Sequence, residues 1–285
     1  MFAYLIYILT LTGIYAIVML AYAVPLGYAG MVNFGEVGLL AVGAYTAAIL
    51  TTHGVSFWLA LPAAALASGL AGFLLSLPAR RVKGDYYALI TLGFIFIVNG
   101  VIVNWTGVTG GPFGISGIRR PAGFEDPFFF FLLVTGMLCA ISYFVHRVLR
   151  SPFGRALEAV RDDDVVAESL GKPTAKLRMT ALTLSAILTG LAGALLAHFI
   201  QFINGQIFWL DNAVFLLAGP VVGGLASFRG VFAGTALVYL MFESVRFLPL
   251  SPDLVGPVRL MAFSGLLLLV VLTRPKGLLG RAQLE

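Results

Sequence analysis

The feature that most constrains this chain is a series of apolar stretches, each about 20 residues long, separated by short polar connections. A helix of that length crosses a hydrocarbon core of about 30 Å, because each residue rises about 1.5 Å along the axis. Hydrophobic residues make up 60% of the 285 residues and charged residues only 11%, against about a quarter charged in a soluble domain. The pattern predicts an all-α polytopic transmembrane helical bundle and excludes a water-soluble globule.

Apolar windows and helix breakers place eight or nine spans along the chain. The first stretch lacks a positively charged segment and a small-residue cleavage site, so we expect a retained span rather than a cleaved signal peptide. The second, seventh and eighth spans are rich in glycine, and one of them is a candidate for a broken or re-entrant helix. The candidate spans cover residues 3–24, 30–51, 56–78, 85–105, 127–149, 178–203, 211–227, 229–248 and 256–273.

Lysine and arginine are distributed unevenly between alternate connections. If the N-terminus is outside and nine spans follow, 14 of the 18 positive residues fall on the inner side, where short loops of membrane proteins collect them. The sequence therefore predicts the N-terminus outside and the C-terminus inside. The net charge of +5 reflects this topology and gives no support for a nucleic-acid partner, because the positive residues lie between spans. The outer side keeps Arg119, Arg120, Arg246 and Arg259.

The connection over residues 150–178 differs from the others, because it holds 11 of the chain's 31 charged residues. The aspartates at 162–164 suit the start of a helix, and Gly171 suits its C-cap. We predict two short amphipathic helices on the cytoplasmic surface. A helix lying on the membrane is the alternative, but it would favour Lys and Arg on its polar face, whereas the mixed charges here favour a protein partner. Four apolar residues recur at helical spacing and are expected near one face: Leu157, Val160, Ala167 and Leu170.

Few polar side chains lie at membrane depth, where they are costly. Glu36 is the leading candidate to line a pathway, since an unpaired carboxylate there costs about 2.5–3.5 kcal/mol. Hydrogen bonding between helices is the alternative for Glu36 and the favoured reading for Asn33 and Asn99. Glu243 and Arg246 are three residues apart on one helix, so we expect a structural ion pair. The candidate pathway residues are Asn33, Glu36, Thr91 and Asn99.

Motifs for catalysis or for metal, cofactor or nucleotide binding are not found in the sequence. The three histidines are isolated and only one cysteine is present, so we expect neither a catalytic group nor a metal site. The nucleotide-binding pattern G-x-x-x-x-G-K-[ST] does not occur, so energy from ATP would have to come from a partner. An ion-coupled secondary transporter is an alternative, but such a protein would usually carry more intramembrane Asp or Glu.

Four segments together carry a family resemblance. They are GYAGMVNFGEVGLLAVGAYTAA (27–48), NWTGVTGGPFGISGI (104–118), SPFGRALEAVRDDDVVAESLG (151–171), and VVGGLASFRGVFAGTAL (221–237) followed by RPKGLLG (274–280). In this order and spacing they resemble the permease subunits of branched-chain amino-acid ABC importers, the LivM type, over nearly the whole chain. Glu158, Ala159 and Gly171 match the EAA loop of ABC importers. Val160 departs from that pattern, and Glu36 stands where relatives often carry His or Gln.

The resemblance implies one transmembrane permease domain over 1–285 that forms half of a translocation pathway and contains a coupling loop at 150–178. The implied partners are a homologous second permease, two cytoplasmic ATP-binding subunits and a periplasmic solute-binding protein, assembled in a bacterial inner membrane with the N-terminus periplasmic. Branched-chain or related amino acids are the expected substrates, with urea, short amides or aromatic acids as alternatives. The loop is expected to anchor in an ATPase groove by apolar and polar contacts through Leu157, Glu158, Ala159, Val160, Arg161 and Gly171.

Overall fold

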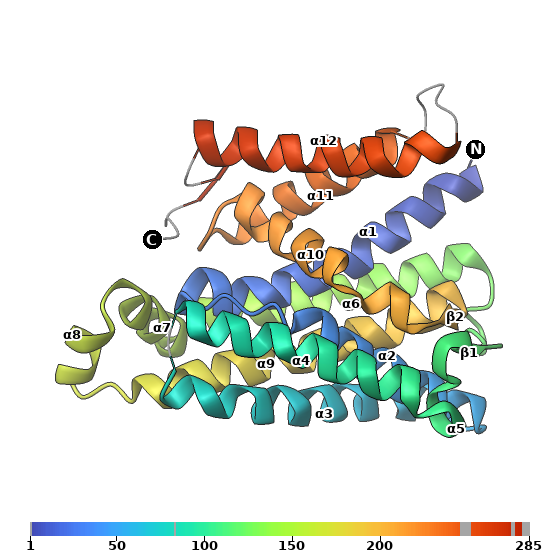
Figure 1. The fold of residues 1–285 in the computed structure, drawn as a ribbon, viewed down its shortest axis with the longest axis horizontal. Coiled ribbons are helices and arrows are strands. Elements are labelled where there is room, and N and C mark those ends of the chain that lie inside the picture. Colours follow the sequence, from blue (N-terminus) through green and yellow to red (C-terminus); the bar gives the residue numbers. More distant parts are fainter. Residues whose placement is uncertain (1, 83, 246–251, 275–276, 281–285) are drawn as a thin grey trace.

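The computed structural model describes residues 2–82, 84–245, 252–274 and 277–280. Within these ranges, nine helices of 14 to 27 residues run roughly along the long axis of the molecule (Figure 1). Each predicted span overlaps one of them, which confirms the all-α bundle. They are α1 (Phe2–Ala23), α2 (Glu36–Thr52), α3 (Phe57–Ser76), α4 (Asp85–Asn104), α6 (Pro127–Arg150), α9 (Thr174–Ile200), α10 (Leu210–Gly223), α11 (Phe228–Ser244) and α12 (Pro252–Thr273).

The three glycine-rich spans are shorter in the structure than most of the others. In the described part of the chain, α1, α3, α4, α6 and α9 are long and apolar enough to cross a membrane. The second span begins at Glu36 rather than at residue 30, because a π-helical segment, η1 (Val24–Tyr28), and an irregular stretch precede α2. The seventh span, α10, has only 14 residues, about 21 Å of helix. Broken structure in glycine-rich segments is thus found at the start of α2 and after α10.

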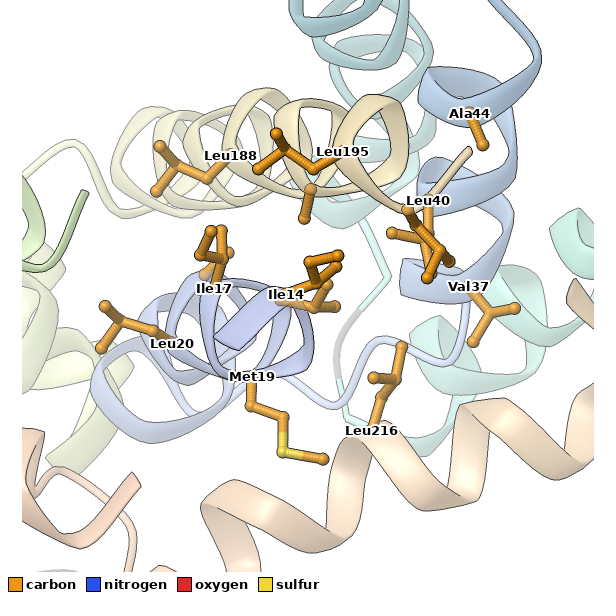
Figure 2. Packing of buried hydrophobic residues seen from close by; sticks show 14 of the residues in the cluster. Ile14, Ile17, Met19, Leu20, Val37, Leu40, Ala44, Leu188, Leu195 and Leu216 are labelled. Carbon is orange, nitrogen blue, oxygen red and sulfur yellow. The ribbon is translucent and has the colours of Figure 1, made fainter. Parts of the chain in front are cut away.

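The core lies around α9, most of whose residues are buried. Figure 2 shows Ile14 and Ile17 of α1 pointing toward Leu188 and Leu195 of α9, whereas Met19 points toward α10. All five side chains are at most 4% exposed. Apolar residues of all nine long helices belong to one continuous core within this single chain.

Small residues let α2 and α3 approach α9 closely. A Cβ atom added to Gly43 would lie 2.4 Å from the carbonyl oxygen of Gly190, and one added to Gly72 would lie 2.1 Å from the Cβ of Ala186. Both distances are shorter than two nonbonded atoms can approach. The backbone of Gly190 and the methyl group of Ala186 therefore occupy the space that a side chain at Gly43 or Gly72 would need. In a membrane such close packing takes the place of the hydrophobic effect in holding helices together.

The hairpin of α10 and α11 is packed in the same way. Its two GxxxG spacings face each other, since a Cβ on Gly223 would lie 1.9 Å from the carbonyl oxygen of Gly230, and a Cβ on Gly234 would lie 2.1 Å from that of Gly219. Such close approach of two helix backbones is what GxxxG spacings permit.

The two ends of the bundle differ in structure (Figure 1). One end, the α7–α8 end, carries two short helices, and the described C-terminal segment 277–280 lies there, bonded to the last carbonyls of α10. The opposite end, the ribbon end, carries the start of α1 and a two-stranded antiparallel ribbon. The described chain therefore begins and ends on opposite sides. The remaining elements are η2 (Leu77–Arg80), α5 (Thr106–Thr109), η3 (Gly111–Phe113), β1 (Ile115–Ser116), α7 (Pro152–Asp162), α8 (Asp164–Ser169), β2 (Phe202–Ile203) and η4 (Gly205–Phe208).

Candidate functional site

The α7–α8 end is shaped by local capping of its two helices. Ser151 caps α7 by accepting a hydrogen bond from the amide of Phe153 (3.2 Å). Asp163 caps α8 by accepting hydrogen bonds from two amides in its first turn (2.9 and 3.0 Å). Gly171 follows α8 with a φ of +77°, the left-handed conformation typical of a helix C-terminus. The two short helices predicted for residues 150–178 are therefore present.

Leu157 and Val160 are buried inside this chain. Their side chains are 0% and 1% exposed, because this face of α7 packs against α6, α9 and η1. They are not accessible to a partner in this structure, which corrects the expectation that they anchor in an ATPase. Glu158 is half-buried and Ala159 is exposed. The helical spacing identified a buried face correctly, but the burial is intramolecular.

Three apolar side chains at and after α8 are exposed, and we call them the α8 surface. Val165 and Leu170 are 73% exposed and Val166 is 52% exposed. Leu170 was expected near one helical face with Leu157, Val160 and Ala167, but α8 ends at Ser169 and the Leu170 side chain is exposed while the other three are buried. Val165 and Val166 were not predicted from the sequence. They are adjacent, and helical spacing singles out apolar residues three or four positions apart on one helix face. An exposed apolar group outside the bundle is typical of a contact surface.

Arg161 connects α7 to the broken connection between α1 and α2. Its Nη1 donates a hydrogen bond to the carbonyl oxygen of Gly27 in η1 (2.9 Å), and its Nη2 lies 2.7 Å from Oδ1 of Asp162. A Cβ added to Gly30 would lie 3.0 Å from the Cγ of Arg161, so this stretch and the arginine are tightly packed. The polar contact expected with a partner is thus made within the chain.

A second ion pair joins α8 to the first turns of α9. Arg178 Nη1 lies 3.0 Å from Oδ2 of Asp164. Together with Arg161, this pair links the short helices to the start of α9 and to the α1–α2 connection. A displacement of α7 and α8 would therefore be transmitted directly to two parts of the bundle.

Glu36 lies at the first position of α2 and is 1% exposed. Its carboxyl group accepts hydrogen bonds from Asn33 Nδ2 (2.9 Å), from Thr189 Oγ1 (2.7 Å) and from the Ser185 hydroxyl. These bonds join α2 to α9 and offset the cost of burying the group. They support hydrogen bonding between helices, the alternative weighed for this residue. Pathway lining by Glu36 stays a prediction.

Thr91 belongs to the same cluster from the side of α4. Its hydroxyl accepts a hydrogen bond from the amide of Phe34 (3.0 Å), while Asn33 Oδ1 accepts one from the amide of Gly35 (3.0 Å). The irregular stretch before α2 is therefore held by side chains in place of helical hydrogen bonds, which satisfies its buried backbone groups.

Asn99 lies apart from this cluster, toward the ribbon end. Its Nδ2 donates a hydrogen bond to the carbonyl oxygen of Gly205 (2.8 Å) in η4. It lines a cavity of about 510 Å³ together with Gln206, Trp209 and Asp211. The structure thus brings three of the four predicted pathway residues together and leaves Asn99 at a separate site.

Another cavity, which we call the outer cavity, has a volume of about 320 Å³ and lies between α1, α10, α11 and α12. Oε2 of Glu243 lies 3.6 Å from Nη2 of Arg259 beside it, and the Tyr4 hydroxyl donates a hydrogen bond to Glu243. Arg246, the partner predicted for Glu243, lies outside the described residues. Arg259 was not predicted as a site residue. It is one of only four positive residues expected outside the membrane, which could have indicated a role there.

Comparisons with known proteins agree with these features. Residues 4–272 match the family described as branched-chain amino acid transport system, permease component. This range includes all nine long helices, apart from the first two residues of α1 and the last residue of α12. The high-affinity branched-chain amino acid transport system permease protein LivM of Salmonella typhimurium is 37% identical over 95% of this chain and 69% of its own length. LivH of the same organism is 26% identical over 97% of this chain and 94% of its own.

Among solved structures, PsaBC from Streptococcus pneumoniae in complex with Fab is similar in fold. The likeness covers 94% of this chain and 91% of that chain, with a TM-score of 0.51 and 16% sequence identity. The family match and the similarity to LivM extend over nearly the whole bundle. This chain belongs to the family of permease components of branched-chain amino acid transport systems.

Proposed function

We propose that this chain is one of two homologous permease subunits of an ABC importer in a bacterial inner membrane, and that it forms half of the pathway for branched-chain or related amino acids. Family membership supports the class of protein, and the names of its relatives support the substrate. The sequence contains no nucleotide-binding motif. Two separate ATP-binding subunits would therefore supply the energy, and a periplasmic solute-binding protein would deliver the substrate.

The α7–α8 end would face the cytoplasm, which places the start of α1 in the periplasm. Positive residues at this end support the orientation, because short cytoplasmic loops retain Lys and Arg. The positive residues of α7, α8 and the helix ends next to them are Arg80, Arg81, Arg147, Arg150, Arg155, Arg161, Lys172, Lys176 and Arg178.

The single observation that carries the coupling role is the α8 surface. Val165, Val166 and Leu170 are exposed on the only part of the described chain where two short charged helices project from the bundle. We infer that an ATP-binding subunit buries these side chains, since apolar anchors usually dominate such interfaces. Residues 150–178 would act as the coupling loop, with Glu158 and Ala159 beside the contact and Gly171 ending α8. Movement would reach the bundle through Arg161.

The experiment is to co-express this chain with the ATP-binding subunits and the second permease, and to purify through a tag on this chain. We expect Leu170→Arg to lower recovery of the ATP-binding subunit by about tenfold or more, because a charge would enter an apolar contact. The second permease should still co-purify. Leu170→Met, which stays apolar, is the matched control and should assemble normally. Full recovery of the ATP-binding subunit with Leu170→Arg and with Val166→Arg would contradict the assignment of this surface.

A further inference from the structure

The outer cavity combines charges of both signs with an aromatic wall. Phe215, Phe242 and Phe263 come from three helices, and their ring centroids lie 5.1, 5.7 and 6.1 Å apart, distances at which aromatic rings attract one another. The volume of about 320 Å³ is near the lower limit of small-molecule pockets, which span about 300–1,000 Å³. The cavity therefore suits one small molecule with an apolar part.

Arg259 lines this cavity, and two of its nitrogen atoms have no hydrogen-bond acceptor among the described residues. Its guanidinium lies 5.6 Å from the centroid of the Phe242 ring and beside Glu243. Its Nε and Nη2 atoms are buried, yet they donate no hydrogen bond to any of the described residues. Buried donors without acceptors are costly, and a planar guanidinium matches the two oxygens of a carboxylate. Such a group is the natural partner of an α-carboxylate.

Asp211 supplies the opposite charge. It lies in the first turn of α10 and lines both the outer cavity and the adjoining cavity that contains Asn99. Its side chain is exposed, and no ion pair joins it to another described residue. A carboxylate of this kind accepts hydrogen bonds from an ammonium group. The acidic group is therefore available to a ligand in either cavity.

We propose that the outer cavity is a binding site for a zwitterionic amino acid with an apolar side chain. Arg259 binds the α-carboxylate, Asp211 binds the α-ammonium group, and the three phenylalanines contact the side chain. The inference rests on the proposed function and deepens it, because it assigns named residues to a substrate site at the end where the solute-binding protein would release its cargo. A ligand with only one of the two charges makes only one of these two contacts, so it binds more weakly.

The test uses protection of a cysteine from a thiol reagent. Cys139 is the only cysteine of the chain, so Cys139→Ser provides the background into which Leu260→Cys is placed. Leu260 lines the cavity and is 55% exposed. The labelling rate of this chain is measured in the assembled importer, without ATP and without the solute-binding protein. Leucine at about ten times its dissociation constant should slow labelling about tenfold, because only the unoccupied fraction reacts.

The charge requirement is tested with isocaproate, which lacks the ammonium group, and isoamylamine, which lacks the carboxylate. Both should protect far less than leucine at equal concentration. Arg259→Gln and Asp211→Asn should each weaken protection by leucine about tenfold or more, while Arg119→Gln, an exposed charge outside the cavity, should not change it. If Arg259→Gln fails to assemble, Arg259→Lys takes its place, because it keeps the charge. Leucine should protect this variant measurably, but less than it protects the protein with Arg259.

Two results would overturn the site. One is that leucine leaves the labelling rate unchanged. The other is that all three compounds protect equally and that leucine protects both charge variants as well as the unchanged protein. Uptake of leucine by the same wild-type complex is measured in parallel. ATP-driven uptake without protection rejects this site and leaves the proposed function standing. Protection without ATP-driven uptake of any amino acid rejects the proposed function instead.

Discussion

Glu36 is an acidic group within an apolar bundle, and its partners explain how the fold retains it. Three donors, from Asn33, Ser185 and Thr189, are directed at one carboxyl group, and a hydrogen bond to a charged group contributes about 1.5–3 kcal/mol. The group stabilises the contact between α2 and α9 at the point where the helix begins. Its expected role at this scale is to hold the irregular stretch before α2 in one conformation.

We predict that Glu36→Ala lowers the thermal stability of the assembled importer, because three buried donors lose their acceptor at about 1–3 kcal/mol each. Glu36→Gln keeps one acceptor oxygen and should cost less. Thermal unfolding in detergent measures both, with Glu125→Ala, at an exposed position outside the coupling loop, as a control for loss of a carboxylate. A Glu36→Ala complex that melts like the wild type but transports nothing would favour pathway lining instead.

Individual residues could be predicted only in part from the sequence. Glu36, Asn33 and Thr91 stand out in the sequence because polar residues are rare in apolar spans, and the structure places them in one hydrogen-bonded cluster. Ser185 and Thr189, the partners of Glu36, lie about 150 residues away and resemble ordinary helix residues. The spacing of Leu157 and Val160 indicated a buried face without indicating which protein buries it. Such contacts depend on tertiary packing, which one sequence does not reveal.

At the scale of helices, the bundle depends on close approach between small residues. Glycine in α3 permits contact with α9, since a Cβ on Gly72 would overlap Ala186. Other helical glycines of the bundle face open space, such as Gly136 in α6, which has no atom within 4 Å of an added Cβ. The two positions therefore differ in packing although both are helical glycines.

We predict that Gly72→Ala destabilises the protein by about 1–3 kcal/mol, the usual cost of overpacking. Gly136→Ala is the matched control and should be neutral or stabilising, because alanine favours a helix over glycine by about 1 kcal/mol. Unfolding of both variants in one detergent tests the difference. Equal stability of the two variants would mean that α3 and α9 can separate without cost.

The positions of the helices were largely predictable from the sequence, but the lengths of α2 and α10 and the conformation of η1 were not. Long apolar windows predicted all nine long helices of the described chain, and capping residues such as Asp163 and Gly171 predicted where the short helices lie. The shortening of α2 and α10 was foreseen only as a general property of glycine-rich spans. The sequence does not show that η1 takes a π-helical form, because its hydrogen bonds and its contact with Arg161 form only in the folded chain.

The whole molecule has one end that would meet the ATP-binding subunits and another that would meet the solute. The α8 surface lies at the first end and the two cavities lie toward the second. Arg161 joins α7 to η1, and Arg178 joins α8 to α9, a helix of 27 residues that extends through the bundle. This arrangement is suited to converting a cytoplasmic movement into a change at the opposite side. The charged loop at residues 150–178 was the sequence feature that indicated it.

The central claim is that this chain works as an ATP-driven permease subunit coupled through α8. Its most direct test is uptake of leucine into proteoliposomes that contain the complete importer and the solute-binding protein, with ATP on the side of the ATP-binding subunits. The account predicts uptake that requires ATP, is lost with Leu170→Arg and persists with Leu170→Met. Uptake by this chain alone on a proton or sodium gradient, without ATP, would contradict the account and establish an ion-coupled transporter.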